Sequence, residues 1–300
     1  MDMKHESVLL NECIENLKIK PQGIYVDATI GGGGHSQKIL KRLDGGFLVG
    51  FDQDDFAINY ANNRLKEYSN FKIVKSNFRN LKEELNKLGI FKIDGILFDL
   101  GLSSFQIDDR KRGFSYLGDF DLDMRMNQDQ AISAKDIINT YSLEQLTTIF
   151  RNYGDEKNAY QISKKIIGAR PITKTSELVK ITDEVNYKVK GHSAKRVFQA
   201  LRIEVNEELD ALKEVLADLN DLLNPGGRIV IITFHSLEDR IVKHFFKENS
   251  EVKIIKGMPV PIEPKPNFKI ITKKPILPSK EEITNNSRSR SAKLRVAEKV

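Results

Sequence analysis

The stretch Tyr25-Val-Asp-Ala-Thr-Ile-Gly-Gly-Gly-Gly-His35 passes from a short apolar segment into four consecutive glycines. The residues that follow have helical spacing, so the pattern predicts a buried strand, a glycine loop and the start of a helix. Glycine lets the backbone approach a ligand closely, and the free N–H groups at the start of a helix face that ligand. The stretch therefore predicts a cofactor site.

Strand and helix patterns alternate on both sides of this loop. Continuous apolar segments predict four buried strands, at 24–29, 47–51, 71–74 and 93–100. Helical spacing predicts the helices between them, at 36–43, 56–68 and 81–88. Such alternation is typical of a parallel sheet covered on both faces, which makes the fold class α/β.

The alternation stops after the fourth strand. Between Gly101 and His192 we expect no strand, and helices are predicted at 143–152, 159–169 and 176–185. An insertion at this point starts from the carboxyl edge of the sheet, where open α/β sheets bind their ligands. We therefore expect a helical lid or substrate-recognition domain.

Sheet patterns resume towards the C-terminus. One long helix is predicted at 193–223, ended by Asn224-Pro-Gly-Gly227, then a strand at 228–234 and a helix at 239–248. Weaker strand patterns lie at 252–256 and 268–272, and residues 279–300 are polar and basic, as in a loosely held tail. The expected division is a cofactor-binding domain at 1–104 and 201–278, a helical domain at 105–200 and a tail at 279–300.

Composition limits the class of protein. The 300 residues carry a net charge of +6, and the segment 157–202 holds 11 basic and 3 acidic residues, which favours contact with a polyanion. A solvated helix face is the alternative explanation of that charge. No segment has the length and polarity of a membrane span or a secretion signal, so a cytoplasmic protein is expected. Cys13, the single cysteine, is predicted to be a buried structural thiol.

Asp52 indicates which class of cofactor the loop binds. It ends the second predicted strand about twenty positions after the glycines, where an acidic side chain can bind ribose hydroxyls. NAD, ATP and S-adenosylmethionine all contain ribose. The loop lacks the P-loop lysine and the dehydrogenase glycine spacing, and Asp27 suits a cationic methionyl group better than a pyrophosphate. S-adenosylmethionine is therefore the favoured cofactor, and methyl transfer the favoured reaction.

Asp99 stands at the end of the fourth predicted strand, in Asp99-Leu-Gly-Leu-Ser-Ser-Phe-Gln106. A carboxylate at that edge can accept hydrogen bonds from an exocyclic amine and align its nitrogen with a methyl donor. We predict that Asp99 is the catalytic residue that orients the amine. The alternative is that Asp99 only caps the end of its strand.

Several motifs together resemble one known family, the ribosomal RNA small subunit methyltransferase H family, also called MraW. The resemblance runs from His5 nearly to the C-terminus and includes Ser287-Arg-Ser-Arg-Ser-Ala-Lys-Leu-Arg295. Its six main motifs are Asp27-Ala-Thr-Ile-Gly-Gly-Gly-Gly-His-Ser36, Asp94-Gly-Ile-Leu-Phe-Asp-Leu-Gly-Leu-Ser-Ser104, Arg112-Gly-Phe-Ser-Tyr116, Leu122-Asp-Met-Arg-Met126, Arg196-Val-Phe-Gln-Ala-Leu-Arg202 and Phe234-His-Ser-Leu-Glu-Asp-Arg240.

This resemblance implies a class I, Rossmann-like methyltransferase with a seven-stranded, mostly parallel sheet. It implies methylation of the N4 amine of one cytidine at the decoding centre (P site) of bacterial 16S rRNA, within the small ribosomal subunit, with S-adenosylmethionine as donor. The residues it implies at the cofactor are Gly33, Gly34, His35, Asp52, Phe78 against the adenine, Asp99 and Gln106. Phe105 and Asp121 depart from prolines common in the family, which affects the expected geometry near Gln106.

Other residues carry expectations of their own. Stacking on a flipped base and packing in the core of the insertion are open alternatives for Phe105, Phe114, Tyr116 and Phe120, and the 112–116 loop is the better candidate for stacking. The residues expected to contact RNA are Arg112, Phe114, Tyr116, Lys195, Arg196 and Arg202. A hydrolase triad from His235, Ser236 and Asp239 is not expected, because all three lie on one predicted turn. The five histidines show no paired ligand spacing, so no metal site is expected.

Two further classes of function stay open from the sequence. A methyltransferase acting on DNA or protein would use the same cofactor half. A non-catalytic ribosome assembly factor would keep the basic segments without needing Asp52.

Overall fold

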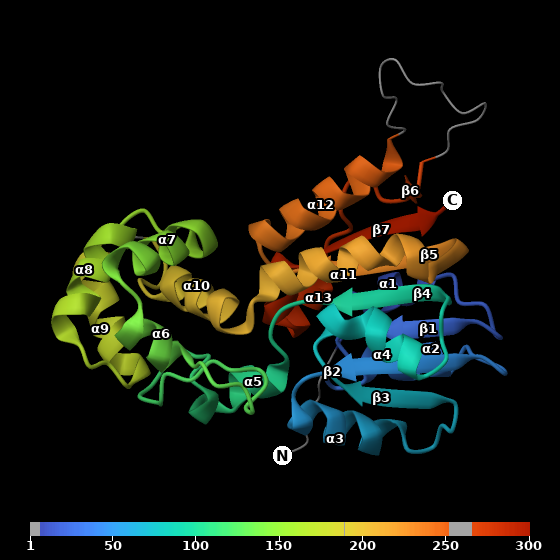
Figure 1. The fold of residues 1–300 in the computed structure, drawn as a ribbon, viewed down its shortest axis with the longest axis horizontal. Coiled ribbons are helices and arrows are strands. Elements are labelled where there is room, and N and C mark those ends of the chain that lie inside the picture. Colours follow the sequence, from blue (N-terminus) through green and yellow to red (C-terminus); the bar gives the residue numbers. More distant parts are fainter. Residues whose placement is uncertain (1–6, 189, 252–265) are drawn as a thin grey trace. The chain divides into compact units, whose positions relative to one another are not determined.

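The computed structural model describes residues 7–188, 190–251 and 266–300. The chain folds into two compact units, whose elements are labelled in Figure 1. We call residues 1–101 with 210–300 the sheet unit and residues 102–209 the helical unit. The predicted insertion at 105–200 falls inside the helical unit. Its expected end lies within helix α10 (Lys195–Asn206), all of which belongs to the helical unit.

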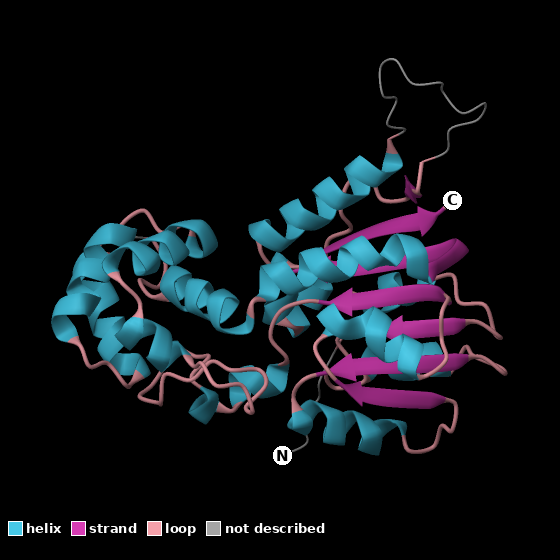
Figure 2. Cartoon of the chain, in the orientation of Figure 1, coloured by secondary structure: helices cyan, strands magenta, loops and turns pink. Residues whose placement is uncertain are grey.

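The sheet unit is built on seven strands in the order β3-β2-β1-β4-β5-β7-β6, drawn in magenta in Figure 2. Their bounds are β1 Ile24–Asp27, β2 Phe47–Asp52, β3 Phe71–Lys75, β4 Ile93–Asp99, β5 Leu223–Thr233, β6 Phe268–Ile270 and β7 Lys293–Lys299. Strands β1 to β5 pair in parallel, whereas β7 runs antiparallel to both of its neighbours. The prediction of an α/β fold with a seven-stranded, mostly parallel sheet is confirmed.

Helices cover both faces of this sheet, which explains why its strands are continuously apolar. Successive strand residues point to opposite faces. Val26 and Ile96 pack with α4, α11 and α12, whereas Tyr25 and Leu97 pack with α1, α2 and α3. These helices span α1 Leu10–Asn16, α2 Gly34–Leu40, α3 Asp55–Leu65, α4 Leu81–Lys87, α11 Glu208–Leu222 and α12 Ser236–Ser250. Cys13 is fully buried, as predicted, in the hydrophobic cluster that contains Tyr25 and Leu97.

The expectation of a loose tail at 279–300 is wrong. Residues Lys280–Asn285 form helix α13, and β7 inserts between β5 and β6, where Leu294 and Val296 are fully buried. The basic residues that suggested a solvated tail are neutralised locally. Asp239 on α12 accepts from Arg295 Nε at 2.6 Å and from Lys293 Nζ at 3.1 Å. Because Asp239 pairs with Lys293 and Arg295, this basic segment can form a strand inside the sheet.

The single long helix expected at 193–223 is also wrong. It is two helices, α10 and α11, separated at Glu207, whose φ is +48°. The Asn206 side chain stabilises this break: its amide nitrogen donates to the Met124 and Arg202 carbonyls, and its oxygen accepts from Met126 N–H, all at 2.8 Å. Hydrogen bonds to the 124–126 loop therefore end α10, although the apolar spacing of a helix continues beyond it.

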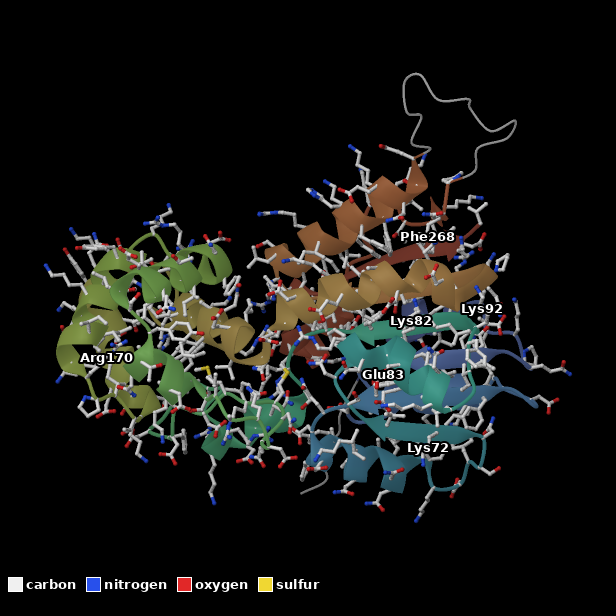
Figure 3. All side chains as sticks on the ribbon, viewed as in Figure 1. Lys72, Lys82, Glu83, Lys92, Arg170 and Phe268 are labelled. Atoms are coloured by element: carbon white, nitrogen blue, oxygen red, sulfur yellow. The ribbon has the colours of Figure 1, made fainter. Side chains whose placement is uncertain are left out.

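The helical unit has its own hydrophobic core. Its elements are α5 Ser104–Asp108, α6 Ala134–Thr140, α7 Leu143–Gly154, α8 Ala159–Ala169, α9 Thr175–Val185 and α10. The predictions for α7, α8 and α9 are correct to within two residues, whereas α5 and α6 are too short to show a helical period. Arg170, labelled in Figure 3, follows α8 and donates to the carbonyls of Ile138 and Tyr141.

Two other expectations concern a strand and a turn of the sheet unit. The strand expected at 252–256 lies outside the described residues. The turn Asn224-Pro-Gly-Gly227 falls within β5, where the register with β4 shifts between Ile93 and Gly95. Within the described residues, every helix is too short or too polar to cross a membrane.

Gly113 fixes the long loop that precedes α6. Its φ is +71°, and a Cβ there would lie 2.3 Å from the Asp121 carbonyl oxygen and 2.9 Å from the Asp123 nitrogen. Gly113→Ala should therefore destabilise the protein by at least about 1–2 kcal/mol, measured by urea unfolding, since both the backbone conformation and the close approach oppose a side chain.

Gly168→Ala is the matched control for this substitution. Gly168 lies in α8, and no neighbouring atom comes within 4 Å of where the alanine methyl group would lie. Alanine should therefore be neutral or stabilising by up to about 1 kcal/mol. Equal unfolding midpoints for the two variants would contradict the role given to Gly113.

Candidate active site

The candidate site lies in the sheet unit, where β1, β2 and β4 end. Asp27 is the last residue of β1 and is almost fully buried. Its carboxylate accepts a hydrogen bond from the Ser36 hydroxyl at 2.7 Å and another from Thr29 N–H at 3.3 Å. Asp27 thus joins the end of its strand to helix α2, across the glycine loop.

The glycine loop connects β1 to α2, as predicted. Gly31 and Gly33 have φ of +48° and +71°, a region that favours glycine, and Gly33 precedes the first turn of α2. The Gly32 carbonyl accepts from Arg64 Nη1 on α3 at 2.9 Å. A side chain of α3, the helix after β2, therefore holds the glycine loop in place.

Asp52 ends β2, which is paired with β1. Its Oδ2 accepts from Gly31 N–H and its Oδ1 from Asp54 N–H, both at 3.0 Å. These bonds fix the plane of the carboxylate, and each oxygen keeps acceptor capacity. The pair of oxygens can therefore serve two vicinal hydroxyls, as the ribose prediction requires.

Asp99 ends β4, on the other side of β1. Its backbone N–H donates to Thr29 Oγ1 at 2.7 Å, which ties β4 to the segment after β1. Its Oδ2 lies 3.8 Å from His35 Nδ1. Its Oδ1 is buried and has no hydrogen-bond partner among the residues that the structure describes. A buried acceptor of this kind is expected to meet a donor from a bound molecule.

The His35 side chain is buried and points back into the sheet unit. Its Nε2 lies 3.0 Å from the Val8 carbonyl oxygen, which can only accept, so Nε2 carries the proton. The other ring nitrogen, Nδ1, faces Asp99 Oδ2. The imidazole thus bonds locally and supports the surroundings of Asp99, a role more common than catalysis for a histidine that opens a helix.

The three carboxylates are partly or fully buried, and burial changes their acidity. Desolvation raises the pKa of Asp99 to about 8, and the negative charges of Asp27, Glu238 and Glu282 contribute in the same direction. Desolvation also raises the pKa of Asp27 and of Asp52 to about 6. A cation bound at this edge would relieve the repulsion, so the donor set fits the sulfonium and ammonium groups of S-adenosylmethionine.

Phe78 lies beyond the end of β3, on the same edge. It begins a short 3-10 helix, Phe78–Asn80, and its ring meets Phe98 of β4 edge-on at a centroid distance of 5.8 Å. The side chain is partly exposed. An adenine contact for Phe78 remains a prediction.

Comparison with known proteins identifies the family. The model of the MraW methylase family matches residues 2–300. The chain belongs to the MraW methylase family. It is 61% identical over 297 residues to ribosomal RNA small subunit methyltransferase H 1 of Acholeplasma laidlawii, covering 99% of each chain. It is 54% identical over 311 residues to ribosomal RNA small subunit methyltransferase H of Finegoldia magna, with both chains fully covered.

A solved structure of an rRNA methylase from Streptococcus thermophilus aligns with 97% of this methylase and 93% of its own chain, at 13% identity and a TM-score of 0.44. The resemblance drawn from the motifs is confirmed by the family match and by the close relatives. The expected cofactor, S-adenosylmethionine, agrees with membership of a methylase family.

The helical unit of this methylase contains Gln106, the remaining predicted cofactor residue. Its side-chain oxygen accepts from Ser103 N–H at 3.1 Å, and the Ser103 hydroxyl accepts from Gln106 N–H at 3.2 Å. This capping box starts α5 and fixes the Gln106 side chain. Phe105 is the second residue of α5 and is buried.

The residues of the 112–116 loop lie mainly inside the helical unit. Arg112 is buried and donates to the carbonyls of Arg125 and Met126. Phe114 is buried in the core cluster, and Tyr116 packs against that cluster, with His192 at a centroid distance of 4.2 Å. Of the two alternatives for these aromatic residues, the geometry favours packing in the core.

The three basic residues predicted on α10 differ in exposure. Arg202 pairs with Glu208 through Nε and Nη2, at 2.7 and 2.8 Å, and keeps 15% of its side chain exposed. Arg196 donates to the Asp155 carbonyl at 3.2 Å, and Lys195 is exposed. Lys195 and Arg196 are better placed than Arg202 for a phosphate.

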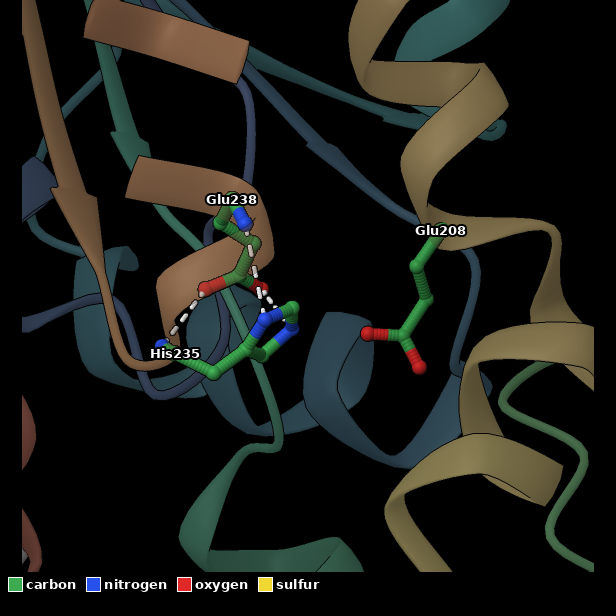
Figure 4. A group of neighbouring side chains, drawn as sticks. All are labelled: Glu208, His235 and Glu238. Carbon is green, nitrogen blue, oxygen red and sulfur yellow. Dashed lines mark hydrogen bonds and ion pairs between the residues drawn. The ribbon is translucent and has the colours of Figure 1, made fainter. Parts of the chain in front are cut away.

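His235 and its neighbours have structural partners. His235 precedes α12, and its Nε2 lies 3.1 Å from Glu238 Oε1, a contact drawn in Figure 4. Asp239 is occupied by Lys293 and Arg295. Glu238 also accepts from Phe234 N–H at 2.8 Å. The motif of 234–240 therefore shapes the turn into α12 and ties this helix to β7.

The raised pKa of Asp99 makes stability depend on pH. The folded protein holds this proton more tightly than the unfolded chain, so the stabilisation is complete below the usual aspartate pKa near 4 and is lost as pH rises through about 8. Asp99→Asn cannot ionise, so its melting temperature should rise relative to the wild type between pH 5 and pH 8.5, measured by calorimetry.

Asp44→Asn is the control, because Asp44 is exposed to solvent. Its melting temperature should keep a constant offset from the wild type across the same pH range. An offset for Asp99→Asn that is also constant would show that Asp99 titrates as an ordinary aspartate.

Proposed function

We propose that this methylase transfers a methyl group from S-adenosylmethionine to the N4 amine of one cytidine at the decoding centre of bacterial 16S rRNA. The observation that carries the proposal is identity of 53–61% over the whole chain to proteins named ribosomal RNA small subunit methyltransferase H. The cytidine, its N4 atom and the P-site position rest on the motif resemblance. The geometry of Asp99 supports an amine as the acceptor.

The sheet unit supplies the donor side of this reaction. The glycine loop brings backbone N–H groups to the ligand, and Asp52 accepts from the ribose hydroxyls. A bound cationic methionyl group would lower the raised pKa values of Asp27 and Asp99 and so favour their negatively charged forms. When bound, S-adenosylmethionine supplies a methyl group on a sulfonium, an electrophile with a neutral leaving group.

Asp99 performs the step on the acceptor side. A cytosine N4 amine is a poor nucleophile because its lone pair is delocalised into the ring. Oδ1 of Asp99 accepts one N–H bond and directs the nitrogen lone pair at the methyl carbon. With the donor bound, a new N–C bond would form as the donor's C–S bond breaks, and the nitrogen would then lose one proton to water or to Asp99.

In this proposal the helical unit binds the RNA. The segment 157–202 carries 11 basic and 3 acidic residues, and Lys195 and Arg196 face outward or partly outward on α10. If phosphate contacts dominate, affinity falls steeply with added salt. The proposal thus assigns the methyl donor to one unit and the polyanion to the other.

Mass-spectrometric mapping of methylated nucleotides in small-subunit RNA, with and without the gene, tests the assignment. We expect one N4-methylated cytidine to lose its methyl group in the deletion strain. Assays of radioactive methyl transfer to free rRNA, assembled small subunits, DNA and protein separate the RNA enzyme from a methyltransferase for DNA or protein. An assembly factor without catalysis would show no binding of S-adenosylmethionine by calorimetry.

Asp99→Ala tests the catalytic role. At saturating S-adenosylmethionine and RNA, kcat should fall by about 10²–10³, the typical cost of removing one positioned hydrogen-bonding group, while RNA affinity stays within about twofold. The exposed Asp44→Ala is the matched control and should retain kcat. Wild-type turnover by Asp99→Ala would remove Asp99 from the mechanism.

A further inference from the structure

Two exposed tyrosines stand out in the helical unit. Tyr187 keeps 74% of its surface exposed and Tyr160 keeps 50%, whereas Phe114 and Tyr116, the aromatic residues expected at RNA, lie in or against the core. An exposed aromatic ring can stack on a nucleic-acid base. Tyr160 is the second residue of α8, and Tyr187 follows the end of α9.

Buried hydrogen bonds hold the two tyrosine positions at the same end of the α8 and α9 pair. Asn186, which directly precedes Tyr187, is 3% exposed. Its Oδ1 accepts from Asn158 Nδ2 at 2.8 Å, and its Nδ2 donates to Glu156 Oε2 and to the Ser193 carbonyl, both at 3.1 Å. The turn that carries Tyr187 is therefore anchored to the segment that leads into Tyr160.

A lysine lies beside each of these tyrosines. The Lys188 ammonium lies 5.1 Å from the centroid of the Tyr187 ring, on one face of it. Lys164 is exposed and lies four residues after Tyr160, on the same face of α8.

Nearby carboxylates are engaged by other groups. Glu184 pairs with Lys165, Asp183 accepts from the Ser193 hydroxyl, and Glu156 is buried against Asn186. Lys188 and Lys164, the lysines beside the tyrosines, are exposed to solvent.

We infer that Tyr187 and Tyr160 form a stacking surface for unpaired RNA bases, with Lys188 and Lys164 at the adjoining phosphates. This inference rests on the proposed function for its substrate class and assigns a second RNA contact, separate from α10. Stacking on an aromatic ring with a cation beside it is the usual way to hold single-stranded RNA. Because stacking on a ring tolerates any base, this surface would contribute affinity for RNA, and the active site would contribute the specificity for one nucleotide.

The surface is better suited to RNA than to a protein partner. An apolar protein interface would need a contiguous apolar patch, whereas here each tyrosine has a lysine beside it, a residue that protein interfaces disfavour. Lys188, placed on one face of the Tyr187 ring, leaves the opposite face for a base and can reach the phosphate of the same nucleotide.

Fluorescence anisotropy with the full-length variants and a short fluorescein-labelled single-stranded RNA tests the inference. Tyr187→Ala should raise Kd by about 5- to 150-fold, the range for one stacked base, and Tyr187→Phe should stay within about twofold, because stacking needs the ring and not the hydroxyl. Lys188→Gln should reduce the slope of log Kd against log salt by about 0.7. Ile132→Ala, at a 54% exposed apolar residue of the same unit, is the control.

Each outcome bears on one of the two proposals. Tyr187→Ala binding the RNA as tightly as the wild type would overturn the stacking surface, and methylation of rRNA by the wild type would still support the proposed function. Binding that depends on Tyr187 in a protein that methylates no rRNA would support the surface and overturn the proposed function. Loss of binding to assembled subunits, but not to protein-free RNA, would show that the surface docks a protein.

Discussion

The structure depends on the parallel register of β2, β1 and β4. Because parallel strands end at one edge, Asp52, Asp27 and Asp99 all end their strands there. Desolvation is the main cause of their raised pKa values, and the charge of Asp27 adds to the effect at Asp99. The edge is therefore unfavourable for negative charge on its own, which favours a cationic ligand.

The two ends of the chain help to form the surroundings of Asp99. Glu282 on α13 accepts from Leu9 N–H at 2.8 Å, and Val8 O meets His35 Nε2. Glu282 also contributes to the raised pKa of Asp99. Since β7 follows α13 and pairs with β5, completion of the sheet positions α13 as well. The C-terminal segment is thus part of the fold that supports the site.

In the helical unit, residues of the same type have different roles, some in the core and some on the surface. Its aromatic residues divide between a core, with Phe114 and Tyr116, and an exposed end, with Tyr187. Its basic residues divide in the same way: Arg112 and Arg202 satisfy carbonyls or a carboxylate, whereas Lys188 and Lys195 remain exposed. Residue type alone does not distinguish these cases, because burial depends on which loop packs on which helix.

The sequence by itself determined the α/β fold, the strand ends that carry Asp27, Asp52 and Asp99, and the family. It could do so because apolar periodicity and glycine spacing are local properties of the chain. Tertiary structure decided what depends on distant partners: the break at Glu207, held by Asn206 against the 124–126 loop, and the burial of β7, whose basic residues needed Asp239. Only the folded chain brings such partners within hydrogen-bonding distance.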